Sequence, residues 1–223
     1  MTTTDFIKKA YEALNSTTKY GKGTFGQKAT KSFLAQKAKQ YPDFYTASKV
    51  NELAASGAYL YDCVGLIKGI IWGYPEKGKY KSGGLSDVSD QGLWDTYCIN
   101  KSKDFSNIKP GAIVHIKGHV GIYVGDGLVI ECTTKWSGNV LISSIKKGEA
   151  RYRSWTEYGY LKILEDKETP KPTYSMDYIV KRGDTMYSIA KKHNMSLREL
   201  IALNPQIKIP SLIFPGDVIH IRK

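Results

Sequence analysis

Three side chains in this sequence have the types and the spacing to carry out nucleophilic catalysis. Cys63 directly follows Asp62 at the start of an apolar segment, and His119 and Glu131 lie further along in a region rich in β-branched residues. A cysteine nucleophile needs a base to take its proton, and the base needs a third group to orient it. Cysteine, histidine and glutamate can fill these three roles, so we ask which elements would bring them together.

The segment "DCVGLIKGIIWGY", residues 62–74, predicts a helix that begins at Cys63. Its apolar residues recur at helical spacing, and Asp62 is a favourable N-cap. The partial positive charge of a helix N-terminus favours thiolate over thiol, which is why nucleophilic cysteines are often placed there. A buried structural cysteine at the start of a core helix would explain the same segment without chemistry.

Residues 110–134 predict three strands, the last two of which form a hairpin. To keep the apolar residues of both hairpin strands on the core face, the loop must span residues 125–127, with Val124 paired to Leu128. In this register Glu131 faces a glycine and is the diagonal neighbour of His119, within reach of its imidazole. Cys132 points to the core, so we expect it to be structural.

Other interpretations of these polar residues remain open. His119 and Glu131 could form a buried cross-strand pair without chemistry. His115, on the preceding strand, is a rival base, although His119 is favoured by its neighbouring carboxylate. His193 and His220 lie near the C-terminus, where we expect surface positions.

Composition bounds the kind of protein. The chain has 223 residues, a net charge of +12 and 41% hydrophobic residues, as is ordinary for a globular protein. No stretch approaches the roughly 20 apolar residues of a membrane span, and the N-terminal "MTTTDFIKKAYEALN" lacks the features of a signal peptide. The positive charge favours an anionic surface as a partner, while the motifs of nucleic-acid binding are missing. Three cysteines do not suggest a disulfide framework. Nothing in the sequence calls for a cofactor or a metal.

Residues 164–176 contain charges, Pro170 and Pro172 without apolar periodicity, which predicts a semi-rigid linker. This linker divides the chain into domains 1–163 and 177–223. The second domain predicts the order strand, helix, helix, strand, and Ser196 with Glu199 forms a capping box at its second helix.

The tail resembles a LysM domain. Tyr178, "GDT" at 183–185, "SIA" at 188–190, "LNP" at 203–205 and "PGDVIHI" at 215–221 carry the resemblance in the proper order. It implies binding to glycans that contain N-acetylglucosamine, such as peptidoglycan or chitin. The implied groove is lined by Gly183, Asp184, Thr185, Met186, Asn204, Pro205 and Ile207. Each of the turn residues among them could instead serve only the turn or the helix stop.

Residues 1–163 resemble the NlpC-type, papain-like cell-wall cysteine hydrolases. The resemblance is carried by "DCVGL" at 62–66, "GHVGIYVGDG" at 118–127 and "VIECT" at 129–133. It implies an α+β fold with helices packed on an antiparallel sheet, with Cys63 as nucleophile, His119 as base and Glu131 as third member. Tyr20 in "KYGKGTFG" matches a tyrosine that lines the site, although a buried aromatic is an equal alternative.

This chain departs from the family pattern in ways that leave the cleaved bond open. Val64 replaces the usual serine, "PGAIV" lacks the common aspartate, and the third member is more often histidine. A glutamate at that place is similar to the related CHAP amidase-peptidases.

Together the resemblances imply a peptidoglycan hydrolase that cleaves an amide of the stem peptide and is held at the wall by its LysM domain, with anionic wall polymers as possible further partners. With no signal peptide, a phage endolysin is favoured, made in the host cytoplasm and acting on the wall after release. The alternatives are a bacterial autolysin with N-acetylmuramoyl-L-alanine amidase activity, a non-catalytic glycan-binding protein, an acyltransferase and a nucleic-acid binder. The sequence does not name the bond, the host, the wall chemotype or the oligomeric state.

Overall fold

The computed structural model describes residues 1–165, 176–195, 197–204, 207 and 213–221. Contacts within the chain divide it into two compact units, Met1–Lys167 and Glu168–Lys223. No helix among the described residues is long and apolar enough to cross a membrane.

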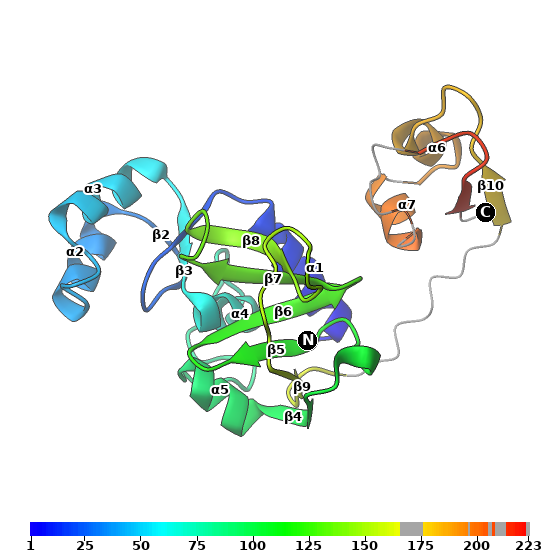
Figure 1. The fold of residues 1–223 in the computed structure, drawn as a ribbon. Helices are drawn as coiled ribbons and strands as arrows, with labels where there is room; N and C mark the ends of the chain where they lie inside the picture. Colours follow the sequence, from blue (N-terminus) through cyan, green and yellow to red (C-terminus); the bar gives the residue numbers. More distant parts are fainter. Residues whose placement is uncertain (166–175, 196, 205–206, 208–212, 222–223) are drawn as a thin grey trace. The chain divides into compact units, whose positions relative to one another are not determined.

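The first unit is built from helices and two sheets (Figure 1). Its helices are α1 (Thr3–Leu14), α2 (Lys31–Gln40), α3 (Ala47–Ser56), α4 (Cys63–Trp72) and α5 (Asp90–Tyr97), with a 3-10 turn η1 (Phe105–Asn107). Its strands are β1 (Thr18–Tyr20), β2 (Phe25–Lys28), β3 (Tyr59–Tyr61), β4 (Cys98–Ser102), β5 (Ile113–Ile116), β6 (His119–Gly125), β7 (Leu128–Thr133), β8 (Asn139–Ser144) and β9 (Glu157–Leu161).

The central sheet has six strands in the order β4-β9-β5-β6-β7-β8, and every neighbouring pair is antiparallel. Helices α1 and α4 cover one face (Figure 1), where Phe6, Ile67 and Ile122 are fully buried in the main core. The other face carries a second apolar cluster that includes Tyr123 and Trp155. Because both faces are covered, the buried polar side chains of β6 and β7 need hydrogen-bond partners inside the protein.

Helix α4 begins and packs as its sequence requires. Asp62 is its N-cap and accepts hydrogen bonds from the backbone N–H groups of Gly65 and, at 2.8 Å, Gly23. A Cβ on Gly65 would lie 1.9 Å from the carbonyl oxygen of Thr24, and one on Gly69 would lie 2.3 Å from that of Phe25. The glycines therefore let α4 lie directly against the segment that leads into β2.

The hairpin of β6 and β7 confirms the predicted register along the strands and corrects it at the turn. Ile122 pairs with Ile130 and Tyr123 with Val129, as expected, but Gly125 pairs with Leu128 in place of Val124. The ladder shifts between Tyr123 and Gly125, so the extra residue forms a bulge in β6. The loop then has two residues, 126 and 127, both with positive φ, which is the geometry that twisted hairpins prefer.

Helices α2 and α3 form a lobe of their own between β2 and β3. In Figure 1 they project away from the central sheet, and they pack around the buried Leu34, Tyr45 and Leu53. The small sheet has the order β1-β3-β2, with β1 parallel and β2 antiparallel to β3. This sheet joins the lobe to α4, which directly follows β3.

The second unit has the predicted order of strand, helix, helix and strand. Its elements are β10 (Met176–Ile179), α6 (Met186–Lys192), α7 (Leu197–Leu203) and β11 (Val218–Ile221). The two strands pair antiparallel, and Val180, Ile189 and Leu200 are buried in a small core. Thr185 and Ser188 form a capping box at α6 that sequence reasoning missed. Ser196, expected to cap the second helix, lies outside the described residues.

Candidate active site

Cys63 lies in the wall of a cleft of about 1000 Å³. It is the first residue of α4 and is half-buried. The walls come from the segments around β1 and β2, from α2, from the start of α4 and from residues 80–90. Side chains of α2 and of residues 80–90 were not predicted to take part, because nothing in their local pattern places them opposite Cys63.

The wall segment of residues 80–90 is fixed to α4 by the buried side chain of Lys68. The ammonium group of Lys68 donates to the carboxylate of Asp87 and, at 3.0 Å, to the carbonyl oxygen of Val88. The hydroxyl of Tyr80 donates to the other oxygen of Asp87 at 2.6 Å. Lys68 is buried, so this pairing compensates its charge. The wall of the cleft is therefore attached to the same helix that carries Cys63.

The Cys63 sulfur lies beside the first residues of β6. Burial raises the pKa of Cys63 to about 12, and the negative charge of Asp62 adds to this rise. The backbone N–H groups of Val64 and Val120 donate toward the sulfur, which partly offsets this rise in the pKa. Burial and Asp62 therefore favour the form of Cys63 that keeps its proton, whereas the helix N-terminus favours the thiolate predicted from the sequence. A base is needed to remove that proton.

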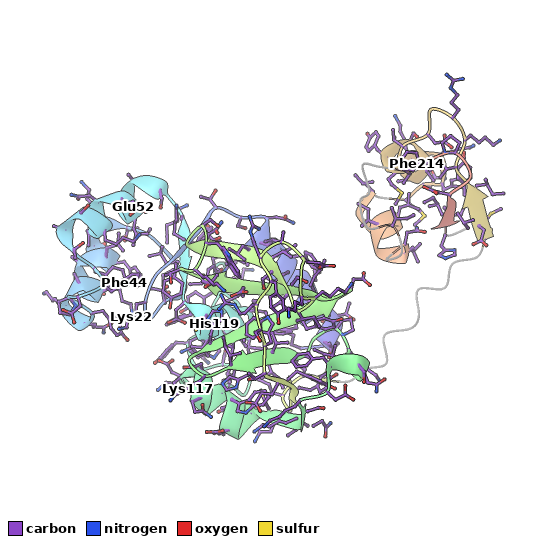
Figure 2. All side chains as sticks on the ribbon, in the orientation of Figure 1. Lys22, Phe44, Glu52, Lys117, His119 and Phe214 are labelled. Carbon is purple, nitrogen blue, oxygen red and sulfur yellow. The ribbon has the colours of Figure 1, made fainter. Side chains whose placement is uncertain are left out.

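His119 directly precedes Val120, whose backbone N–H donates toward the Cys63 sulfur. It is the first residue of β6, and Figure 2 shows it at the end of β6 that lies beside α4. Its Nε2 lies 2.6 Å from Oε2 of Glu131, as the hairpin register predicts. Its side chain is 13% exposed, whereas that of Glu131 is fully buried. The ring stacks on Trp155 with the centroids 5.6 Å apart.

The charge of Glu131 decides which nitrogen of His119 is available. Burial acts to raise the pKa of Glu131, but the hydrogen bond and charge of His119 and the charge of Arg153 hold it below its usual value. An ionised carboxylate only accepts hydrogen bonds, so Nε2 of His119 carries the proton that it shares with Glu131. In the neutral imidazole, Nδ1 is then the nitrogen that can accept a proton.

Arg153 is the member of the site that sequence reasoning missed. Its Nε donates to Oε1 of Glu131 at 3.1 Å, and its Nη2 lies 2.8 Å from Oε2. It comes from a segment before β9 without apolar periodicity, 22 residues from Glu131. The one available signal was that a buried carboxylate requires a cation, which does not say which of many basic residues supplies it.

The rival base, His115, is engaged elsewhere. Its Nδ1 lies 2.9 Å from Oε1 of Glu157, and its ring stacks on Trp94 with the centroids 4.6 Å apart. Neither His115 nor His119 is among the described residues that line the cleft, but Gly118, directly before His119, is one of them. Cys132 is fully buried in the main core, as predicted.

Tyr20 lines the same cleft as Cys63. Burial raises the pKa of Tyr20 above its usual value. The backbone N–H of Tyr20 donates to Gly138 at 2.7 Å, and its ring contacts that of Phe44. The structure therefore brings Tyr20 to the cleft that Cys63 lines.

In the second unit, three of the predicted glycan-binding residues form the turn before α6. Gly183 is exposed, with a φ of +90°, and Thr185 is exposed and caps α6. The carboxylate of Asp184 accepts hydrogen bonds from the Tyr178 hydroxyl at 2.7 Å and from the backbone N–H of Lys181 at 2.8 Å. This turn presents backbone and hydroxyl groups to solvent.

The remaining predicted residues are less accessible. Met186 is buried in the core, and Ile207 is partly buried against it. Asn204 is buried, and its side chain bonds to the backbone of Leu200 and His220. Any contact of Met186 or Asn204 with a sugar would need their backbone groups. Pro205 lies outside the described residues.

Among the described residues, no group of three or more His, Cys, Asp or Glu side chains is arranged to hold a metal ion.

Comparison with known proteins decides the nature of the tail. Residues 178–222 match the LysM domain family. The tail is a LysM domain. Over 90 residues the chain is 33% identical to the endolysin of Bacillus phage B103, covering 39% of this chain and 34% of that protein. Over 54 residues it is 43% identical to the probable autolysin LDP of Staphylococcus aureus, covering 24% of this chain and 18% of that one.

The matched segments thus span about a third or less of these curated relatives. A segment of 55 residues is also 42% identical to the chlorophenol reductase of Desulfitobacterium hafniense, covering 25% of this chain and 17% of that one. Among solved structures, the peptidoglycan hydrolase RipB of Mycobacterium tuberculosis matches with a TM-score of 0.40 and 17% identity, covering 73% of this chain and 65% of that chain. Proteins named for different activities share the short segments, so the activity must be argued from the site.

Proposed function

We propose that this protein hydrolyses peptidoglycan through the thiol of Cys63 while its LysM domain holds it at the glycan. The observation that carries the proposal is the meeting of α4 and β6. There the Cys63 sulfur lies against the backbone N–H of Val120, next to His119, whose imidazole is bound to the buried Glu131. Cys63 lines the cleft, and the base with its orienting group lies directly behind Gly118, which lines it as well.

The mechanism begins with proton transfer, because the free sulfur is a thiol. Nδ1 of His119 takes the Cys63 proton as the sulfur attacks the carbonyl carbon of an amide. The backbone N–H of Cys63, at the start of α4, is free of the helix ladder and donates to the oxyanion. His119 then gives its proton to the leaving amine. A water, deprotonated by His119, attacks the acyl-enzyme and releases the carboxylic acid, while Glu131 holds the imidazole in place.

Resemblance supports an NlpC-type, papain-like domain, with residues 164–176 as the linker to the tail. "DCVGL" stands at the start of α4 and "GHVGIYVGDG" forms the turn into β6, β6 itself and its loop. Glutamate as the third member is shared with CHAP amidase-peptidases. The substrate is an amide of the stem peptide, and Tyr20 lines the site.

The LysM domain supplies affinity for the wall. LysM domains bind glycans with N-acetylglucosamine, and Gly183 and Thr185 are the exposed predicted residues that can reach a sugar. Tethering raises the concentration of the cleft near its substrate. The net charge of +12 adds attraction to anionic wall polymers. Of the two kinds of hydrolase, a phage endolysin is favoured over an autolysin. The alternative to a hydrolase is a non-catalytic glycan-binding protein, which the LysM domain by itself would explain.

The first test compares wild type with Cys63→Ala on purified Gram-positive cell walls. We expect wild type to clear the suspension and release fragments whose new ends, read by mass spectrometry, name the cleaved bond. Cys63→Ala should bind walls equally and release none. Cys98→Ala, which removes a buried thiol on β4, is the matched control and should behave as wild type. If wild type binds walls of several chemotypes and clears none, the glycan-binding alternative replaces the enzyme.

A further inference from the structure

The buried carboxylate of Glu131 is shared between two partners. On one side Nε2 of His119 lies 2.6 Å from Oε2. On the other, Arg153 binds both oxygens, with its Nε 3.1 Å from Oε1 and its Nη2 2.8 Å from Oε2. Nη2 also donates to Oγ1 of Thr133 at 3.0 Å, so the guanidinium lies in a fixed orientation. Such a forked pair is among the strongest charged hydrogen bonds in proteins.

Two indole rings hold the guanidinium of Arg153. Its carbon lies 5.0 Å from the ring centroid of Trp136 and 5.4 Å from that of Trp155. Trp155 also stacks on the imidazole of His119 with an interplanar angle of 18°. A single indole therefore contacts both the cation and the base, which gives Arg153 and His119 a common support.

The charges around His119 set the pH at which it takes up a proton. Glu131 on β7 favours the imidazolium, and Arg153, before β9, opposes it. On α4, Cys63 is uncharged while protonated, and Asp62 is committed to two backbone N–H groups. Lys117, in the turn before β6, is exposed and therefore screened by solvent. Without Arg153, a buried Glu131 would have His119 as its one cationic partner, and burial would favour the ion pair.

We propose that Arg153 is a positioning residue that keeps Glu131 ionised and His119 neutral, so that Nδ1 can accept the Cys63 proton. This proposal rests on the proposed function in one respect, that the proton passes from Cys63 to His119. Its test, however, follows the imidazole itself and does not require hydrolysis.

The test is a pH titration of the full chain, with labelled histidine, by NMR. The chain has four histidines, and His119→Gln identifies the signal of interest. In Arg153→Met we expect the midpoint of the His119 titration to rise by about one pH unit, since a charge next to a titrating group typically shifts it by that much or more. Arg151→Met removes an exposed arginine two positions earlier and should leave the midpoint unchanged.

If Arg153→Met does not fold, Arg153→Lys is measured in its place. The ammonium keeps the charge but cannot bind both carboxylate oxygens, so we expect a smaller rise, and circular dichroism checks the fold of each variant. The proposal is overturned if the His119 midpoint in Arg153→Met is equal to or lower than the midpoint in Arg151→Met. If Arg153→Met is unfolded, the proposal is overturned by a folded Arg153→Lys whose His119 midpoint does not move.

The outcome on cell walls separates this proposal from the proposed function. If walls are cleared, the acid limb of kcat/KM should move up with the His119 midpoint in Arg153→Met. If the midpoint moves but wild type clears no walls, the hydrolase is refuted and the role of Arg153 in setting the charge of His119 stands. If walls are cleared and neither the His119 midpoint nor the acid limb of kcat/KM moves in Arg153→Met, the role of Arg153 is refuted and the hydrolase stands.

Discussion

At the scale of single residues, the candidate site favours a protonated thiol at Cys63 and a charged carboxylate at Glu131. Burial and Asp62 hold the proton on Cys63, whereas His119 and Arg153 together compensate the charge of the buried Glu131. The two groups are therefore in opposite states near neutral pH. In the proposed mechanism, proton transfer from the sulfur to the imidazole is therefore part of the attack on the substrate.

The charge of Glu131 also makes the stability of the fold depend on pH. Because its pKa is lower in the folded protein, its contribution is complete above the unfolded value of roughly 4.3 and is lost as the pH falls through the folded value. We expect Glu131→Gln to cost about 3 kcal/mol of unfolding free energy at pH 7, since it leaves Arg153 buried without a charged partner. Urea unfolding of both proteins should show this gap narrowing at pH 3.

Glu157→Gln is the matched control, because Glu157 is the carboxylate partner of the second buried histidine, His115. Glu157 is less buried than Glu131, so its replacement should cost less at pH 7. A gap between wild type and Glu131→Gln that stays the same at both pH values would show that the carboxylate contributes by packing alone.

At the scale of elements, the position of Cys63 depends on how closely α4 approaches the segment before β2. Gly65 meets the carbonyl oxygen of Thr24, where a Cβ has no room. Gly65→Ala should therefore push α4 away, costing about 1–3 kcal/mol of unfolding free energy, and should slow alkylation of Cys63 or hydrolysis. Chemical denaturation and thiol labelling measure the two effects.

Gly92→Ala provides the comparison within a helix of the same unit. A Cβ on Gly92 in α5 would lie 3.1 Å from the Cβ of Val88, a contact that small movements can relieve. We expect little change in stability and none in Cys63 reactivity. Equal effects of the two substitutions would mean that close packing at Gly65 does not position the cysteine.

The elements that carry the proposed triad could be predicted, because each has a local signal. Asp62 before an apolar segment marks the start of α4, and alternation along β6 and β7 brings Glu131 beside His119. The bulge in β6 has no such signal, since a three-residue loop and a two-residue loop with a bulge keep the same apolar residues on the core face. Arg153 and the walls of the cleft depend on tertiary contacts between distant segments.

The charge state of Cys63 could not be predicted either. The helix N-terminus is visible in the sequence, but the burial that opposes it depends on how β6 and the cleft walls enclose the sulfur. In the tail, neither the capping box of α6 nor the burial of Met186 and Asn204 was predicted, and that burial arises only when the two helices pack on the strands.

At the scale of the whole molecule, two compact units divide the proposed work between cleavage and wall binding. The first unit has its own core around α4 and the six-stranded sheet, and the second has its own core around Val180, Ile189 and Leu200. Their cores share no residue. Removing residues 177–223 should therefore leave the first unit folded and its cleft intact, which circular dichroism and Cys63 labelling can verify.

The removal should affect activity only where tethering matters. On intact cell walls at low enzyme concentration we expect hydrolysis to fall by about 10²-fold or more, because binding to the glycan no longer concentrates the cleft at its substrate. On a soluble stem-peptide fragment, which offers no glycan, the full chain and the shortened chain should have the same kcat/KM. Equal losses on both substrates would mean that the tail supports the first unit itself, and no loss on walls would mean that the cleft and the net charge already supply the affinity.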